Sequence, residues 1–511
     1  MLARVLTAGV LGIDPIPMGV EVDCHPGENY FSMVGLPDQA VKESRDRVGS
    51  ALRNSGRHYP RGKVIINLSP ADVRKEGTAL DLPIAVGMLV ASEQMPGNRL
   101  PEYAMAGELA LDGSIRAVPG ALSLAIGARN QRLRGIVLPD ANAREAGVVE
   151  GIEVIPVSSL NEAADFMAGS RPITPHITDV NAIFEDARRH APDLTDVKGQ
   201  AHVKRALTVA AAGGHNLLMV GPPGTGKTML ASRLPGILPD MTFDEALETT
   251  RIFSVAQLTN AKNALVVQRP FRAPHHTAST VSICGGGTGA QPRPGEVSLA
   301  HNGVLFLDEL PEFNRSALEV LRQPLEEGVV HIRRAMYSVT YPSRFMLVVA
   351  MNPCPCGCRN DPRRQCRCSL GDVQRYMSRL SGPLLDRIDI HIDVPPLSFD
   401  ELASGRATGP SSAEVRSTVQ DARDRQRRRY RGRFTCNAHL DSKTIQATCN
   451  LGDSSRSLLE NAINRMGLSA RAYDKILRVA RTLADLDHNE TISESNVAEA
   501  IQYRSLDQQL F

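Results

Sequence analysis

Short apolar runs separated by turn residues characterise the first third of the chain. Val64–Leu68 and Gly135–Leu138 have the length and composition of strands, and Leu80–Ala91 has those of a helix. Gly169–Thr178 is rich in Pro, Ser and Thr, which predicts a linker. This pattern predicts a first domain over residues 1–170.

Strand-like apolar runs then alternate with helical segments, which is typical of an α/β domain built on a parallel sheet. The runs are Asn216–Val220, Val304–Leu307 and Phe345–Ala350. We expect this second domain to span residues 183–396.

Beyond Pro396 the pattern is helical to the end of the chain, which predicts a third domain over residues 397–511. Ser493 suits the N-cap of a last short helix, with Glu494 in its first turn. Five apolar residues recur every three or four positions and so share one face of a longer helix: Ala472, Ile476, Val479, Leu483 and Leu486.

Composition narrows the functions open to this chain. Its 511 residues are too many for one core. A net charge of +2 excludes a globally basic nucleic-acid coat, and the absence of Trp argues against base stacking as the main binding device. Met1–Gly12 lacks the apolar core of a signal peptide, and Leu80–Ala91 is too short to span a bilayer. We therefore expect a cytoplasmic protein with no membrane association.

A glycine-rich loop follows the run Asn216–Val220 and precedes the helix-compatible segment Met229–Leu234. A phosphate-binding P-loop requires this order of strand, loop and helix. Backbone N–H groups would close around the β-phosphate, Lys227 would neutralise the β- and γ-phosphates, and Thr228 would ligate Mg²⁺. The sequence thus predicts a site for ATP and Mg²⁺ formed by Gly221, Pro222, Pro223, Gly224, Thr225, Gly226, Lys227 and Thr228.

Two further strands end in polar residues that suit ATP hydrolysis. Asp308 and Glu309 follow Val304–Leu307 in the Walker B pattern, in which Asp308 would hold Mg²⁺ through water and Glu309 would act as general base. Asn352 follows the next strand, where a sensor 1 residue would orient the attacking water. An Asn at a strand end is more often a turn former. The sensor 1 interpretation therefore rests on the position of Asn352 after the P-loop and the Walker B strand.

Two arginines are candidates to complete the site. Arg387 matches the arginine finger of ring ATPases, which stabilises charge on the γ-phosphate of a neighbouring subunit and therefore requires an oligomer. The alternative is a structural arginine paired with Asp386 or Asp389. Arg471 fits a sensor 2 residue or, alternatively, a solvated arginine on a helix face.

Two groups of longer motifs extend beyond the ATP site. The central domain contains Pro270–Thr277, Gly285–Gly289, Gly303–Leu310 and Leu384–Asp389, and the first domain contains Val34–Asp38, Ala40–Ser44 and Leu80–Ile84. The first group resembles the magnesium-chelatase-like AAA+ ATPases, and the second resembles the ComM/YifB branch of that family. The resemblance covers essentially the whole chain.

This resemblance implies both a fold and a function. The fold would combine an N-terminal α+β domain like those of ribosomal protein S5 and Lon protease, a central α/β P-loop AAA+ module, and a C-terminal helical lid. The function would be that of a homo-hexameric ring that uses ATP to move along single-stranded, duplex or branched DNA in natural transformation and recombination. Two other classes stay open. A chelatase motor subunit that inserts metal would lack the Lon-like domain, and Glu309 and Arg387 argue against a nucleotide-switched adaptor.

The spacing leaves room for the insertions that this branch should carry. More residues separate Lys227 from Asp308 than a minimal P-loop core needs, and Pro270–Glu296 fits an insert there. Val329–Thr340 predicts a hairpin, which either projects into the ring channel or is an ordinary connector. Its tip would carry Arg333 and Arg334.

Five of the nine cysteines crowd into a short segment directly after the strand that ends in Asn352. Four thiolates would close a tetrahedral Zn²⁺ site in a loop too short for a core of its own. Free thiols are the alternative, because C-x-C spacing is less specific than C-x₂-C. The expected ligands are Cys354, Cys356, Cys366 and Cys368.

Two other groups of residues have less specific interpretations. His275 and His276 point in different directions in a helix or a strand, so we expect a structural or DNA-facing role and no shared metal ion. A basic run in the third domain either contacts DNA phosphates or lies on a solvated helix face; it consists of Arg423, Arg425, Arg427, Arg428, Arg429, Arg431 and Arg433.

The Lon-like pattern raises the question of proteolysis. Its nucleophilic Ser would follow Lys75–Thr78, where this chain has Ala79, and its general-base Lys would fall near Leu122. Without a nucleophile and a base there is no acyl transfer. We therefore expect a catalytically silent scaffold that binds DNA or organises the ring.

Overall fold

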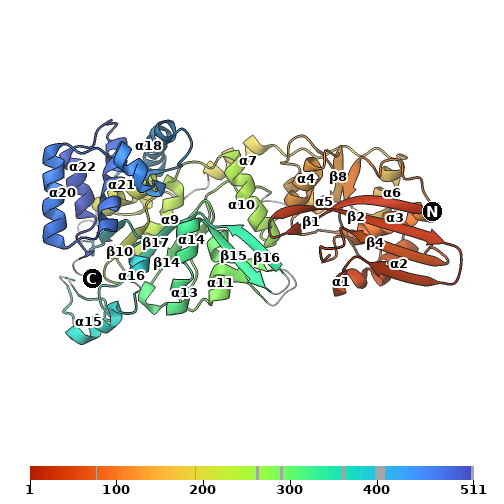
Figure 1. Ribbon diagram of the computed structural model, residues 1–511, viewed down its shortest axis with the longest axis horizontal. Coiled ribbons are helices and arrows are strands. Elements are labelled where there is room, and N and C mark those ends of the chain that lie inside the picture. The colour runs from red at the N-terminus through yellow and green to blue at the C-terminus, as the bar shows by residue number, and fades with distance from the viewer. Residues whose placement is uncertain are drawn as a thin grey trace.

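The structure is a computed structural model that describes residues 1–75, 77–189, 192–259, 264–287, 292–334, 337–359, 361, 363–380, 382–397 and 409–507. A sheet-rich N-terminal region, a central α/β region and a helical C-terminal region follow one another along its longest axis (Figure 1). This order agrees with the predicted fold class.

The N-terminal region is a seven-stranded sheet covered by helices. Its elements are β1 (Leu2–Leu11), β2 (Asp14–His25), β3 (Tyr30–Val34), α1 (Gln39–Lys42), α2 (Ser44–Asn54), β4 (Lys63–Ser69), α3 (Asp81–Ala91), β5 (Tyr103–Met105), β6 (Glu108–Leu109), β7 (Ile115–Arg116), α4 (Ala121–Asn130), β8 (Gly135–Pro139), α5 (Asp140–Ala146), β9 (Glu153–Val157) and α6 (Leu160–Ala168). The strand order is β3-β4-β2-β1-β5-β8-β9, with β1 and β2 paired as a long antiparallel hairpin. α2, α3 and α6 pack on one face, and α4 and α5 on the other. Every residue of α3 is buried, which explains its continuous apolar sequence.

The segment predicted as a linker, Gly169–Thr178, contains no helix or strand, but it is tied to the N-terminal region. The His176 N–H donates to the Val154 carbonyl at 2.8 Å, and the Thr178 N–H donates to the Gly147 carbonyl at 3.2 Å. α7 (Val180–Arg189) follows it and leads into the central region.

The central region is built on a five-stranded parallel sheet. Its elements are η1 (Leu194–Asp196), α8 (Ala201–Gly213), β10 (Leu217–Val220), α9 (Lys227–Ile237), α10 (Phe243–Val255), β11 (Phe271–Arg272), α11 (Thr280–Cys284), β12 (Gly285–Gly286), β13 (Arg293–Pro294), α12 (Glu296–Leu299), β14 (Val304–Leu307), η2 (Leu310–Glu312), α13 (Arg315–Glu319), α14 (Arg322–Glu327), β15 (Val329–Arg334), β16 (Tyr337–Pro342), β17 (Met346–Met351), α15 (Leu370–Met377), α16 (Gly382–Leu385) and β18 (Ile390–Asp393). The strand order is β11-β14-β17-β10-β18.

Both faces of this sheet are covered. Leu217 and Met219 of β10 pack with α8 and α9, while Leu218 and Val220 pack in the cluster that includes the β15–β16 hairpin. Parallel strands buried on both faces are apolar at every position, which is why the three predicted strands were recognisable and are confirmed.

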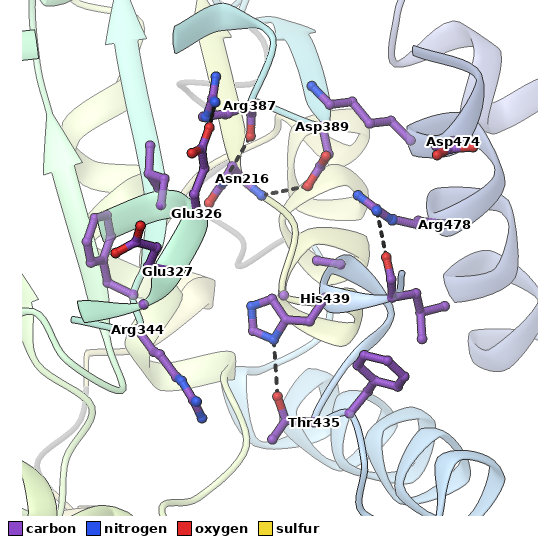
Figure 2. A pocket seen from close by; sticks show the side chains of 18 of the residues that line it. Asn216, Glu326, Glu327, Arg344, Arg387, Asp389, Thr435, His439, Asp474 and Arg478 are labelled. Carbon is purple, nitrogen blue, oxygen red and sulfur yellow. Dashed lines mark hydrogen bonds and ion pairs between the residues drawn. The ribbon is translucent and has the colours of Figure 1, made fainter. Parts of the chain in front are cut away.

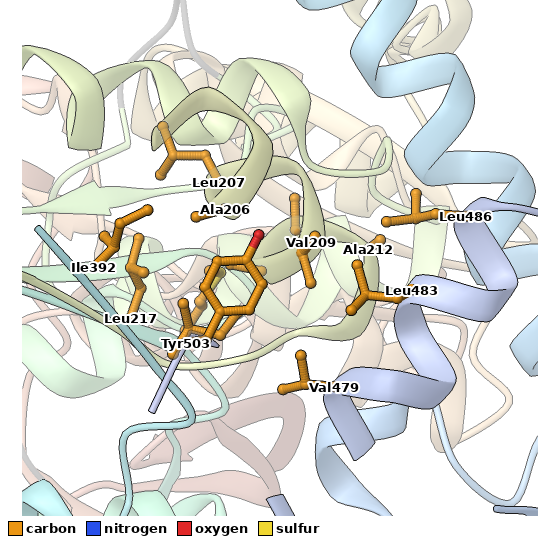
Figure 3. Close-up of a cluster of buried hydrophobic side chains, with 14 of the residues drawn as sticks. Ala206, Leu207, Val209, Ala212, Leu217, Ile392, Val479, Leu483, Leu486 and Tyr503 are labelled. Carbon is orange, nitrogen blue, oxygen red and sulfur yellow. The ribbon is translucent and has the colours of Figure 1, made fainter. Parts of the chain in front are cut away.

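The C-terminal helices share a core with the central sheet. They are α18 (Ser412–Tyr430), η3 (Asn437–His439), α19 (Ser442–Thr448), α20 (Asp453–Met466), α21 (Ala470–Leu486) and α22 (Glu494–Gln502). Val479, Leu483 and Leu486 of α21 belong to the same buried cluster as Leu207 of α8 and Ile392 of β18 (Figure 3). All five residues of the predicted apolar face of α21 are buried, and Ser493 caps α22 as predicted. The apolar packing therefore fixes α21 relative to the sheet.

The N-terminal region is docked on α10. The Arg251 guanidinium donates to the Ile13 carbonyl at 2.6 Å and to the Asp14 carboxylate at 2.9 Å, and the Ser254 hydroxyl donates to Glu145. Burial raises the pKa of Glu145. In Figure 1 the tip of the β1–β2 hairpin accordingly points at α10 and the β15–β16 hairpin.

Candidate active site

The P-loop joins the carboxyl end of β10 to the first residue of α9. Gly226, the residue before that helix, has a φ of 84°, a left-handed conformation that glycine adopts readily. A Cβ added at Gly224 or Gly226 would meet no other atom within 4 Å. The loop is therefore uncovered at these positions, as a loop whose backbone approaches phosphate must be.

Lys227 connects the P-loop to the strand that ends in Asn352. Its Nζ donates to the carbonyls of Gly221 and Pro222 at 2.7 and 2.9 Å, and to Asn352 Oδ1 at 3.2 Å. Burial lowers the pKa of Lys227, while Asp308 and Glu309 act to raise it. Two residues 125 positions apart in sequence, both expected to belong to the ATP site, are thus in contact.

Thr228 and Asp308, the two expected Mg²⁺ ligands, are in direct contact. The Thr228 hydroxyl donates to Asp308 Oδ2 at 2.7 Å. A hydroxyl and a carboxylate beside a phosphate-binding loop form the oxygen donor set that Mg²⁺ prefers, so these residues fit the ion.

Glu309 is adjacent to this pair and has a histidine partner. Its N–H donates to Asp308 Oδ1 at 2.9 Å, and its Oε2 lies 3.3 Å from His276 Nδ1. The His275 and His276 rings lie side by side, tilted by 35° with their centroids 4.0 Å apart. The contact of His276 with the expected general base was missed from the sequence. The available signal was its position: β11 pairs with β14, so residues shortly beyond β11 lie near the end of β14.

Arg387 lies at the other edge of the sheet. Asn216, which precedes β10, donates through Nδ2 to the Arg387 carbonyl at 2.9 Å and through its N–H to Asp389 at 3.3 Å. The P-loop follows the opposite end of the same strand. Arg387 and the P-loop of one chain therefore lie at opposite ends of β10.

The Arg387 guanidinium pairs with Glu326 of α14, not with Asp386 or Asp389 as the structural alternative proposed (Figure 2). Burial lowers the pKa of Arg387, and the nearby cations Arg322 and Arg471 lower it further, while Glu319 acts to raise it. Three arginines thus lie close together at this edge of the sheet.

Arg471 lies on the Arg387 side, away from the P-loop of its own chain. Its Nη1 lies 3.1 Å from the Asp386 carboxylate, and its side chain is 69% exposed. Lys475, one turn further along α21, donates to the carbonyls of Asp386 and Ile388. Burial lowers the pKa of Lys475 to about 8. Arg387 and Arg471 both line a polar cavity of about 630 Å³, part of which is drawn in Figure 2.

The hairpin predicted within Val329–Thr340 is confirmed as β15 and β16, with Arg334 opposite Tyr337 at its end. Arg333 is exposed on the polar face of the hairpin. The side chain of Arg334 and the turn at 335–336 lie outside the described residues.

Several arginines of the basic run are engaged within the chain. Arg423 donates to the Ala211 carbonyl at 2.9 Å, and Arg429 Nη1 donates to the Asp485 carboxylate at 3.0 Å. These two hold α18 against α8 and α21, so the run is neither wholly a solvated face nor wholly available to DNA.

Comparison with known proteins identifies the family. Residues 193–402 match the family "Magnesium chelatase, subunit ChlI", residues 20–142 match "Subunit ChlI of Mg-chelatase", and residues 409–504 match "Magnesium chelatase, subunit ChlI C-terminal". The chain is 46% identical to "Uncharacterized protein YifB" of Escherichia coli, over 100% of this chain and 98% of the relative. It is 45% identical to "Competence protein ComM" of Haemophilus influenzae, over 99% and 98%. The chain belongs to the ComM/YifB family of magnesium-chelatase-like AAA+ ATPases.

The N-terminal region of this ComM/YifB family member is similar to part of Lon protease. A Lon protease of Lachnoclostridium phytofermentans is 24% identical over 156 residues, which is 28% of this chain and 19% of the protease. Ala79 and Leu122, at the expected positions of nucleophile and base, both lie in one apolar cluster. Ala246 of α10 belongs to the same cluster, so this surface packs against the ATPase region.

The cysteine segment brings four thiols together. The sulfurs of Cys354, Cys356, Cys366 and Cys368, the four predicted ligands, all lie within 4.8 Å of one another. Cys358 instead donates to the Cys356 carbonyl. Hydrogen bonds from the backbone of Cys358 and Arg367 lower the pKa of Cys356 to about 5, which favours the thiolate. This donor set is compatible with structural Zn²⁺.

Among the described residues, the structure has no helix that is both long enough and apolar enough to cross a membrane.

Proposed function

We propose that this protein is an ATP-driven, homo-hexameric DNA translocase that migrates branched DNA during natural transformation and recombination. The membership of an AAA+ ATPase family supports the ATPase, and the relative named as a competence protein supports the DNA-related role.

The proposal that the subunits form a ring rests on one observation. The P-loop and Arg387 lie at opposite ends of β10. A finger in that position can act only on the nucleotide of another subunit, so the complete site requires the edge of one chain to meet the P-loop of the next.

The P-loop residues, with Lys227, would hold ATP, and Thr228 and Asp308 would hold Mg²⁺. Magnesium would bridge and neutralise phosphate oxygens. Glu309 would take the proton of the attacking water, and Asn352, already bonded to Lys227, would orient that water. His276 would orient the Glu309 carboxylate.

Arg387 and Arg471 would both act across the subunit interface. They line one cavity at one edge, and Asp386 and Lys475 link the two segments. We therefore assign the sensor 2 role of Arg471 to the neighbour's nucleotide.

The cysteine segment would bind one Zn²⁺ that stiffens the active site. Cys354 follows Asn352 by two residues, and a Cβ added at Gly357 would lie 2.6 Å from Pro223 of the P-loop. The metal would hold this segment against the P-loop and take no part in the chemistry.

Replacing Glu309 with Gln tests the general base. The variant should bind ATP and assemble like the parent, because Lys227 and Thr228 remain, but turnover should fall by at least about a hundredfold. Nucleotide binding and phosphate release are measured separately. If the variant hydrolyses ATP near the parent rate, the assignment of Glu309 as general base is wrong. If the parent protein itself binds ATP but does not hydrolyse it, a nucleotide-switched adaptor is favoured.

Mixing two inactive variants tests action between subunits. Arg387→Ala keeps an intact P-loop, and Lys227→Ala keeps an intact finger, so mixed rings should contain some complete sites and recover part of the ATPase activity. Native mass spectrometry establishes that mixed rings form. Mixed rings with no recovered activity contradict a finger supplied in trans.

DNA should stimulate the ATPase, and the hairpin should carry that effect. ATP hydrolysis is measured without DNA and with single-stranded, duplex and four-way-junction DNA. Arg333→Ala/Arg334→Ala removes two cations that would contact phosphates of any sequence, so it should abolish stimulation and branch migration while ATP binding persists. The conservative Arg333→Lys/Arg334→Lys variant is the matched control and should retain most of the stimulation. If none of these DNA substrates changes the ATPase rate of the parent protein, the proposed function is contradicted and a chelatase-type motor is favoured.

The purified protein should contain about one Zn²⁺ per chain. Elemental analysis measures the metal, and Cys354→Ser should remove it, whereas Cys284→Ser, outside the cluster, should not. Protein prepared without chelators that lacks stoichiometric zinc would contradict the metal site.

A further inference from the structure

The guanidinium of Arg387 is held within its own chain. One terminal nitrogen, Nη1, donates to the Pro383 carbonyl at 2.5 Å, and the other, Nη2, pairs with the Glu326 carboxylate (Figure 2). The Arg387 side chain is only 18% exposed, whereas that of Glu326 is 54% exposed. Both nitrogens that would contact a neighbour's phosphate are therefore engaged.

Glu326 belongs to α14, the helix that leads directly into the β15–β16 hairpin. α14 ends at Glu327, and only Gly328 separates it from β15. The Ser343 N–H donates to the Gly328 carbonyl at 2.8 Å and closes the base of the hairpin. A Cβ at Gly328 would lie 2.8 Å from Arg344 Cγ, so this joint is tightly packed. A displacement of the hairpin is thus transmitted to α14 with little slack.

We propose that Glu326 is a positioning residue that withholds Arg387 until DNA at the β15–β16 hairpin moves α14. The inference rests on the proposed function and specifies its regulation. With the pair closed, the carboxylate neutralises the guanidinium and occupies its Nη2. With the pair open, the free cation can reach the γ-phosphate held by the neighbouring subunit.

The surroundings of the Arg387–Glu326 ion pair favour a pair that opens and closes readily. Arg322 and Arg471 both lie close enough to Arg387 to lower its pKa, whereas Glu319 acts to raise it. The Glu326 carboxylate pairs directly with the same guanidinium. The carboxylate is half exposed, and ion pairs in contact with water contribute little and exchange readily. A small movement of α14 is therefore sufficient to open the pair.

Glu326→Gln tests this inference, because it removes the charge while keeping the shape of the side chain. The DNA-free ATPase rate should rise about fivefold, the equilibrium effect of an ion pair worth up to about 1 kcal/mol, and the ratio of stimulated to basal rate should fall correspondingly. Glu327→Gln is the matched control, since Glu327 is adjacent on the same helix and similarly exposed but pairs with His331 of β15 and not with Arg387. It should keep the basal rate of the parent.

A second variant separates release of Arg387 from an indirect structural effect. Glu326→Gln/Arg387→Ala should hydrolyse ATP no faster than Arg387→Ala alone, because the gain requires the freed guanidinium. A gain that survives the loss of Arg387 overturns the proposal. An unchanged or lowered basal rate in Glu326→Gln overturns it as well, the latter because Glu326 would then be orienting Arg387 for catalysis.

The two hypotheses fail in different ways. A parent enzyme that no DNA stimulates contradicts the DNA motor, yet a raised rate in Glu326→Gln would still establish the restraint on Arg387. A parent stimulated by DNA, together with a Glu326→Gln variant that behaves like Glu327→Gln, sustains the motor and refutes the restraint.

Discussion

The parallel direction of the five central strands separates the residues to which we assign catalytic roles. Loops that follow the strands lie at one edge of the sheet, and residues that precede them lie at the other. Lys227, Asp308 and Asn352 follow β10, β14 and β17, whereas Arg387 is held by Asn216 before β10. At about 3.3 Å per residue, even a strand of four residues keeps these edges roughly 13 Å apart. The position of Arg387 is thus a consequence of the fold.

The β15–β16 hairpin is connected to both edges. Its first strand continues α14, which carries Glu326 and contacts Arg387. Its second strand leads through Ser343 and Phe345 into β17, whose far end carries Asn352. A force on the hairpin would therefore reach both Asn352, for which we propose a water-orienting role, and Arg387, the proposed finger for a neighbouring subunit. This arrangement suits a motor in which DNA contact and hydrolysis depend on each other.

The sequence predicts the parts of this site that are local and cannot predict those that arise from packing. The P-loop is a contiguous motif between a strand and a helix, and Thr228, Asp308 and Asn352 follow buried strands, so their meeting at one edge follows from parallel topology. The partners His276 of Glu309 and Glu326 of Arg387 come from a loop and a short helix whose positions no periodicity specifies. The side on which Arg471 lies depends on how the shared core orients α21.

The N-terminal region covers one face of the β15–β16 hairpin and leaves the other face exposed to solvent. A Cβ at Gly12, in the β1–β2 tip, would lie 2.5 Å from Val339 Cγ1, and Ile13 belongs to the apolar cluster that contains Val330 and Ile332. Strand residues alternate between faces, so covering Val330 and Ile332 leaves His331 and Arg333 exposed. Arg251 anchors the same tip to α10. The N-terminal region thus packs against the apolar face of the hairpin and leaves the face that carries Arg333 exposed.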